Sequence, residues 1–293
     1  MKKTWEGGLA APLSTILLLN FSGLLSICLA AAFVLPSPVF SQKKTSALPA
    51  SAVSQKKTSG LPALAFFQNQ ELLVAAAADL ATAGPPLAQA FERAAGIRVQ
   101  FVFGASGMLA RQIENGAPYD VYLSANERFV EDLARSGRVD AGTVRVYALG
   151  RLGLWSKRRS LSSLEDLRDP SFRHIAIANP VHAPYGAAAK QALENKGLWK
   201  ELERRIVYGE NVRQALQYAE SGNAEAVITS WSLVFDRGAL LLPESLHAPI
   251  RQSGGMVAST KNAAAARAFL DFLGSPQGQA ILKAHGLALP PSR

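Results

Sequence analysis

Three junctions between an apolar run and a helical pattern carry small residues and isolated polar side chains. They are residues 75–80 (AAAADL), 103–107 (FGASG) and 179–186 (NPVHAPYG). Asp79, Ser106 and Tyr185 each stand where a helix is expected to begin. The first N–H groups of a helix have no partner within the helix and carry positive partial charge, so such junctions bind anions without a formal positive charge. We therefore expect an anion site where these junctions meet.

The same junctions have a simpler interpretation and an enzymatic one. Small residues before a helix are ordinary caps and turns, so each junction alone carries little weight, and the anion interpretation depends on several of them converging. The segment around Ser106, GASGM, resembles the G-x-S-x-G turn of serine hydrolases, but Met108 stands at its last position. The patterns G-x-x-x-x-G-K-[ST] and G-x-G-x-x-G are also missing from the sequence. We expect no enzyme, and a hydrolase that uses Ser106 is the weaker alternative.

Cysteine, histidine and charge argue against other kinds of site. The one cysteine, Cys28, lies in an N-terminal apolar stretch, and the four histidines show no metal-ligand spacing, so we expect no bound metal cation and no cofactor. Residues 1–70 contribute +5 of the formal net charge of +9, and the remainder has no long run of Lys or Arg. The sequence therefore gives no reason to expect nucleic acid as a partner.

The folded part of the chain is expected to begin near Glu71, and from there strands and helices alternate. Apolar, β-branched or aromatic runs predict strands at residues 72–77, 97–103, 119–124, 151–156, 174–178, 203–208, 226–229 and 255–259. Helical patterns, several of them ended by glycine, predict helices at residues 86–95, 108–115, 127–136, 163–167, 185–196, 212–221, 262–273 and 276–285. This alternation indicates an α/β fold with βαβ units and mainly parallel sheets flanked by helices, and the pattern restarts near residue 150.

The restart divides the folded part into two α/β lobes. Lobe 1 is expected over residues 71–148 and lobe 2 over residues 149–249, and residues 250–293 return to lobe 1. Strands near residues 148–150 and 246–252 would then join the two lobes. A cleft between two such lobes is a common place for a small ligand, so we expect the three junctions to face it.

Residues 1–41 have the pattern of an export signal. Two lysines precede an apolar segment over about residues 13–35, and small residues near its end suit cleavage after Ser41. The apolar segment is also long enough to span a bilayer, which leaves an uncleaved membrane anchor as the alternative. A polar stretch repeated as SQKKTSALPA and SQKKTSGLPA dominates residues 42–70, which are expected to form a low-complexity linker.

Several motifs together resemble the periplasmic molybdate-binding proteins of ABC importers. The resemblance is carried by residues 75–80 (AAAADL), 103–116 (FGASGMLARQIENG), 117–126 (APYDVYLSAN), 179–192 (NPVHAPYGAAAKQA) and 211–216 (NVRQAL). The stretch RQIENGAPYDVYLSAN is the most specific part, and the likeness covers about residues 71–289. It implies a two-lobed type II periplasmic-binding-protein fold with a hinge and with the ligand in the interlobe cleft.

The resemblance also implies which residues hold the oxyanion. Ser106 matches a serine of the family, and Tyr185 and Val212 stand where the family uses backbone N–H groups. Two positions depart from the family pattern, in which a serine and a tyrosine contact the anion. Asp79 stands where many members have that serine, and Ser230 stands where many have that tyrosine. Tyr185 is a candidate replacement for the lost phenol.

Asp79 is the more demanding departure, because a carboxylate aimed at a dianion is repelled strongly in a dry cleft. We expect the side chain to turn away and cap its helix, which leaves only backbone N–H groups for the ligand. A protonated carboxyl group, or a ligand other than molybdate, is the alternative.

The resemblance implies an extracytoplasmic carrier that captures molybdate or tungstate and delivers it to the membrane permease of an ABC importer. Molybdate and tungstate have nearly the same shape and charge, so the sequence does not separate them. We expect an exported, periplasmic monomer. A membrane-anchored sensor of the same anion is the main alternative, ahead of a serine hydrolase.

Overall fold

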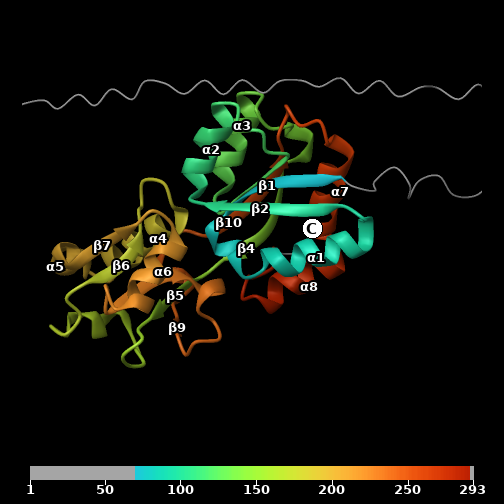
Figure 1. Ribbon diagram of the computed structural model, residues 1–293. Helices are drawn as coiled ribbons and strands as arrows, with labels where there is room; N and C mark the ends of the chain where they lie inside the picture. Colours follow the sequence, from blue (N-terminus) through green and yellow to red (C-terminus); the bar gives the residue numbers. More distant parts are fainter. Residues whose placement is uncertain (1–69, 291–293) are drawn as a thin grey trace, which may run out of the picture. The chain divides into compact units, whose positions relative to one another are not determined.

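The computed structural model describes residues 70–290, which build two five-stranded sheets (Figure 1). The first sheet has the strand order β2-β1-β3-β10-β4. Its strands are β1 (Glu71–Ala77), β2 (Arg98–Gly104), β3 (Val121–Ser124), β4 (Arg145–Gly150) and β10 (Ile250–Met256). Strand β1 pairs in parallel with β2 and β3, whereas β10 runs antiparallel to both β3 and β4. Four strands of this sheet therefore share one direction, and β10 opposes them.

The second sheet repeats this arrangement with the order β7-β6-β8-β5-β9. Its strands are β5 (Leu152–Trp155), β6 (Ile175–Ala178), β7 (Ile206–Gly209), β8 (Ala226–Ser230) and β9 (Leu240–Leu241). Strand β6 pairs in parallel with β7 and β8, and β5 runs antiparallel to β8 and β9. Only Arg151 separates β4 of the first sheet from β5 of the second, so the chain passes directly from one lobe to the other.

Helices flank both sheets (Figure 1). Those of the first lobe are α1 (Gly84–Ala95), α2 (Ser106–Glu114), α3 (Glu127–Arg135), α7 (Ala263–Gly274) and α8 (Pro276–Ala284). Those of the second lobe are α4 (Pro184–Asn195), α5 (Trp199–Leu202) and α6 (Val212–Ser221). The ring of Phe91 in α1 lies 5.2 Å from that of Phe269 and 5.5 Å from that of Phe272, both in α7. The C-terminal helices thus pack on the lobe that the N-terminal strands build.

The predicted fold class is confirmed, and the differences lie in particular elements. Each sheet holds one reversed strand, and β9 and α5 were not among the predicted elements. Strand β4 is longer than the connecting strand that was expected near residues 148–150. Strand β10 starts at Ile250 rather than at residue 255, because its polar and glycine-rich sequence IRQSGGM gives no strand pattern. A Cβ atom on Gly254 would lie 2.5 Å from the Leu123 side chain, and one on Gly255 would lie 2.5 Å from Val139. Close packing, rather than propensity, makes this segment a strand.

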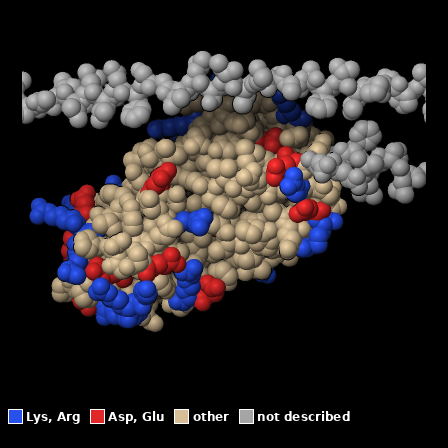
Figure 2. Space-filling view, viewed as in Figure 1, with Lys and Arg blue, Asp and Glu red and all other residues tan. Residues whose placement is uncertain are grey.

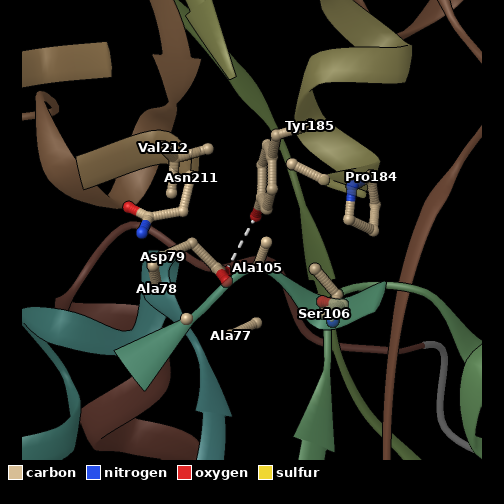
Figure 3. Close-up of a pocket in the computed structure, with 12 residues that line it drawn as sticks. Ala77, Ala78, Asp79, Ala105, Ser106, Pro184, Tyr185, Asn211 and Val212 are labelled. Carbon is tan, nitrogen blue, oxygen red and sulfur yellow. Dashed lines mark hydrogen bonds between the residues drawn. The ribbon is translucent and has the colours of Figure 1, made fainter. Parts of the chain in front are cut away.

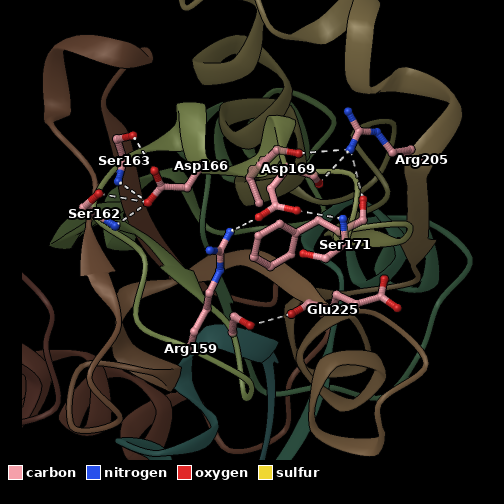
Figure 4. A network of polar contacts seen from close by, with 11 residues as sticks. Arg159, Ser162, Ser163, Asp166, Asp169, Ser171, Arg205 and Glu225 are labelled. Carbon is pink, nitrogen blue, oxygen red and sulfur yellow. Dashed lines mark hydrogen bonds and ion pairs between the residues drawn. The ribbon is translucent and has the colours of Figure 1, made fainter.

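A polar network explains why β7 starts at Ile206 and not at residue 203 (Figure 4). Residues Glu203–Arg205 form a 3-10 turn, and Arg205 Nη1 donates hydrogen bonds to three carbonyl oxygens at 3.1–3.3 Å. The Asp169 carboxylate accepts from Arg159 Nη2 at 2.9 Å and from the Ser171 amide at 2.9 Å. These contacts order the connection that leads into β6.

The surface charge and the possibility of a membrane-spanning helix were also considered in the sequence. On the face shown in Figure 2, Lys and Arg side chains are mixed with Asp and Glu, so this face has no patch of a single sign. Among residues 70–290, no helix is both long and apolar enough to cross a membrane. The predicted export signal and linker lie outside the described residues.

Candidate functional site

A small cavity lies where the carboxyl ends of strands from both sheets meet (Figure 3). Its lining comes from the ends of β1 and β2, from residue 125 after β3, and from the segments that follow β6 and β7. The carboxyl ends of parallel strands are the usual place for a ligand in α/β folds. The cavity volume is about 10 Å³, enough for the centre of about one water-sized molecule. All three junctions singled out in the sequence contribute to it.

Three helices begin at this cavity and leave backbone donors there. Ser106 of α2, Tyr185 of α4 and Val212 of α6 all line it. The backbone N–H groups of these three residues have no hydrogen-bond acceptor within residues 70–290. A helix start concentrates positive partial charge on such free N–H groups. The cavity therefore offers three amide donors from two lobes.

Local sequence explains why these amides stay free. The Asn211 side chain accepts from the amides of Arg213 and Gln214, so it caps α6 and leaves the Val212 amide for another partner. In α4, Pro184 at the first position has no N–H, so Tyr185 supplies the first donor. Gly186 follows it because a Cβ atom there would collide with the Ala178 carbonyl oxygen. Asn before a helix is a recognisable cap signal that the sequence analysis did not use.

Ser106 adds a hydroxyl donor. Its Oγ atom accepts a hydrogen bond from the Ala125 amide at 3.0 Å, and its carbonyl oxygen accepts from the Tyr122 hydroxyl at 2.7 Å. A serine hydroxyl that accepts from an amide keeps its own hydrogen for another acceptor. The residue is 1% exposed, so both contacts fix its position at the start of α2.

Asp79 is held by a buried network and does not cap its helix, so the capping interpretation was wrong. The short helix η2 (Ala78–Ala81) begins after Ala77 and has no side-chain cap. Instead, Asp79 Oδ2 accepts from the Tyr185 hydroxyl at 3.0 Å and from Gln252 Nε2 at 2.5 Å. Figure 3 shows the Tyr185 contact. Gln252 comes from β10, 173 residues along the chain, and no local pattern could have named it as the partner.

The network continues beyond Asp79. Gln252 Nε2 also donates to the Tyr185 hydroxyl at 2.8 Å, and Gln252 Oε1 accepts from the Tyr147 hydroxyl of β4 at 2.9 Å. The contact with Tyr147 fixes which end of the Gln252 amide faces Asp79. Asp79 Oδ1, in contrast, is buried and has no partner within residues 70–290.

Burial dominates the electrostatics of this network. It raises the pKa of Asp79 to about 7, although the hydrogen bonds from Gln252 and Tyr185 and a contact with the backbone of Asp79 itself lower it. Burial, together with the nearby Asp79 charge, also raises the pKa of Tyr185 and Tyr147 well above the usual tyrosine value, so both remain neutral donors. Among the described residues 70–290, no lysine or arginine lines the cavity.

Ser230 lies close to Tyr185, whose pKa burial raises and the Ser230 side chain lowers, but it is not part of the cavity lining. It is the last residue of β8 and is buried, and its Oγ atom lies 2.8 Å from Ser232 Oγ. Ser232 in turn donates to the Asp79 carbonyl oxygen at 2.7 Å. Ser230 does not line the cavity, whereas Asp79, Ser106, Tyr185 and Val212 do. The phenol next to the carboxyl group is that of Tyr185.

Comparison with known proteins gives consistent matches. Residues 72–288 match the family described as bacterial extracellular solute-binding protein. The molybdate-binding protein ModA of Azotobacter vinelandii is 36% identical over 230 residues, which cover 76% of this chain and 91% of that protein. The corresponding protein of Rhodobacter capsulatus is 32% identical, over 74% of this chain and 87% of the relative. The solved Azotobacter vinelandii periplasmic molybdate-binding protein superposes with a TM-score of 0.72 at 34% identity, over 75% of this chain and 99% of that one.

The buried Asp79 carboxyl group should make stability depend on pH. Because its folded-state pKa is raised, the native state binds more protons than the unfolded state between about pH 4 and about pH 7, so this group lowers stability as pH rises through that window. Asp79→Asn keeps the shape and cannot ionise. We expect it to raise the free energy of unfolding at about pH 8 by up to about 4 kcal/mol, and by less at about pH 5. Urea unfolding at the two pH values measures this.

Asp120→Asn is the matched control, because Asp120 is also buried but accepts from the Leu73 amide at 2.8 Å and from Asn262 Nδ2 at 3.2 Å. We expect this variant to lose stability at both pH values. Equal stability of Asp79→Asn and the unmodified protein at about pH 8 would contradict the account of Asp79.

Proposed function

Because this chain belongs to the bacterial extracellular solute-binding proteins and, within them, to the molybdate-binding group, we propose that it captures molybdate outside the cytoplasmic membrane. The observation that carries the proposal is the set of free amides of Ser106, Tyr185 and Val212 around one cavity. A tetrahedral oxyanion presents four acceptor oxygens, and helix starts bind such groups through backbone N–H donors.

The size and chemistry of the cavity support a small oxyanion. The cavity is small and lies between the two lobes, which have to separate to admit a tetrahedral oxyanion. The walls are mainly alanine, glycine, proline and valine, so the backbone can come close to a ligand. Hydrogen bonds are stronger in such a low-dielectric environment than in water. Neutral donors can therefore hold a dianion here. Tungstate has the same shape and charge, and we propose that it binds as well.

The site fits binding rather than catalysis. Ser106 Oγ accepts a hydrogen bond from the Ala125 amide, which is a donor. A nucleophilic serine needs instead a base that accepts its proton. Asp79, the acid of the cavity, is engaged with Tyr185 and Gln252. We propose that the protein works as a carrier without catalysis.

The cellular setting follows from the family and the predicted export signal. We propose that the chain is exported to the periplasm, acts as a monomer, and hands its ligand to the membrane permease of an ABC importer. The salt bridge between Arg251 and Glu127 joins β10 to α3 within the first lobe, so it does not connect the two lobes. Hydrogen bonds from Tyr185 and Ser232 to Asp79 do join the lobes, so opening by rotation about the connecting segments would have to break them.

Calorimetry of the purified protein tests the function. We expect molybdate and tungstate to bind with one site per chain. We expect sulfate and phosphate to bind at least about tenfold more weakly, because a smaller anion cannot reach all the donors that a larger one contacts. Binding of none of these oxyanions would refute the proposal, and tighter binding of sulfate than of molybdate would reassign the ligand.

Ser106→Ala tests the hydroxyl donor. We expect molybdate binding to weaken by roughly ten- to a hundredfold, because a hydrogen bond to a charged group contributes about 1.5–3 kcal/mol. Ser156→Ala is the control, since Ser156 is also a buried serine but donates to the Glu225 carbonyl oxygen and does not line the cavity. Titration of both variants by calorimetry should show the loss in Ser106→Ala alone. Equal affinities of Ser106→Ala and Ser156→Ala for molybdate would show that the Ser106 hydroxyl does not contact the ligand.

Lobe closure can be measured in solution. Ligand donors come from both lobes, so a bound anion should hold the lobes together. We expect small-angle X-ray scattering to give a smaller radius of gyration at saturating molybdate than without it. An unchanged radius at a ligand concentration that calorimetry shows to be saturating would contradict a hinged site.

A further inference from the structure

The carboxyl group of Asp79 lies in the cavity that is proposed to bind an anion, where a negative charge is unfavourable. It lines the cavity with the free amides of Ser106, Tyr185 and Val212, and it is 1% exposed. An ionised carboxylate there would repel a bound dianion, and no lysine or arginine in the cavity lining would offset that repulsion. The two negative groups can share the cavity only if a proton lies between them.

The two carboxyl oxygens of Asp79 differ in a way that places the proton. Oδ2 already accepts from the Tyr185 hydroxyl and from Gln252 Nε2. Oδ1 has no partner within residues 70–290, although it is buried. A proton on Oδ2 would compete with two donors, whereas a proton on Oδ1 displaces none. Once protonated, Oδ1 becomes a hydrogen-bond donor, as the rest of the cavity requires.

We propose that anion binding is coupled to the uptake of one proton by Asp79, and that the protonated Oδ1 then donates a hydrogen bond to a ligand oxygen. This inference rests on the function proposed above. The carboxylate gains the proton from solvent and becomes neutral, the ligand stays a dianion, and no covalent bond to the ligand forms. The bound species is one dianion with one extra proton on the protein.

The surroundings of Asp79 support this role. Burial raises its pKa to about 7, so it takes up a proton readily near neutral pH. Tyr185 of α4 and Tyr147 of β4 are the titratable groups that face it, and both are neutral. Gln252 of β10 and Ser232 of the short helix η6 (Trp231–Leu233) are uncharged donors.

Charged side chains on the elements packed against η2 point elsewhere. On α6, Arg213 and Glu220 line a separate hollow beside Ala81 and Thr82. The charged residues of α1, β1 and β2 are exposed; they are Glu92, Arg93, Glu71 and Arg98. Proton uptake on binding near neutral pH is therefore assigned to Asp79 rather than to a neighbour.

Calorimetry in buffers of different ionisation enthalpy counts the protons taken up with molybdate. We expect close to one proton per anion at about pH 8, and a number that falls towards zero at about pH 6, where Asp79 is already protonated. The dissociation constant should rise by about tenfold per pH unit above about pH 7.5. Molybdate remains a dianion throughout this range, so the ligand itself does not titrate.

Three variants separate the possible sources of the proton. Asp79→Asn cannot ionise but keeps a donor, so we expect no proton uptake, a pH-independent affinity, and binding about tenfold tighter than the unmodified protein at about pH 8. Asp79→Ala should also take up no proton but bind at least about tenfold more weakly than Asp79→Asn, because it has no donor. His182→Gln, which removes the half-buried imidazole next to the cavity, should keep the uptake.

The outcomes are distinct. Molybdate binding without proton uptake at about pH 8 would overturn the inference and leave the proposed function intact. Equal affinities of Asp79→Asn and Asp79→Ala would overturn the contact between Asp79 and the ligand. Uptake that survives Asp79→Asn and disappears in His182→Gln would reassign the proton to the histidine. If no variant binds molybdate at any pH, the proposed function itself fails.

Discussion

A cavity without cations can hold a dianion only through donors that are free and fixed before the ligand arrives. Backbone amides at helix starts meet this requirement, because the helix itself leaves them without acceptors. The rest of the fold serves to bring them together. Parallel strands in both sheets end on the same cavity, and each such end is followed by a helix or a short turn. Small side chains at these ends allow the backbone to approach the ligand. The loss of any one helix start would remove a donor that no side chain in the lining replaces.

Those parts of the fold and of the site that depend on local signals could be predicted from the sequence. Helix α6 spans Val212–Ser221 as expected, because Gly222, in the left-handed conformation, ends it. The three junctions were visible for the same reason, since strand and helix patterns meet there within a few residues. Asp79, Ser106, Tyr185 and Val212 follow from these junctions and from the resemblance, and all four line the cavity. Their role in binding remains a prediction.

Features that depend on distant partners were not predictable in this way. The side chain of Asp79 could be recognised as awkward, but its orientation depends on Gln252, on the crossing strand β10. That strand in turn lacks a strand pattern, because its glycines serve the packing against Leu123 and Val139. The start of β7 was misplaced because Arg205 bonds to carbonyl groups more than thirty residues away. Ser230 matched a family position but bonds to Ser232 and lies outside the lining.

Gly150 ends β4, one residue before the chain enters the second lobe. A Cβ atom at this position would collide with the Tyr185 hydroxyl and would lie 2.9 Å from the Ile250 side chain. The phenol of one lobe thus rests directly on the bare backbone of the other lobe's crossing strand. The closed arrangement of the lobes therefore requires a residue without a side chain at position 150. A single methyl group at Gly150 would hold the Tyr185 ring away from Asp79, and would thereby shift the balance between the closed and open forms from a position outside the cavity lining.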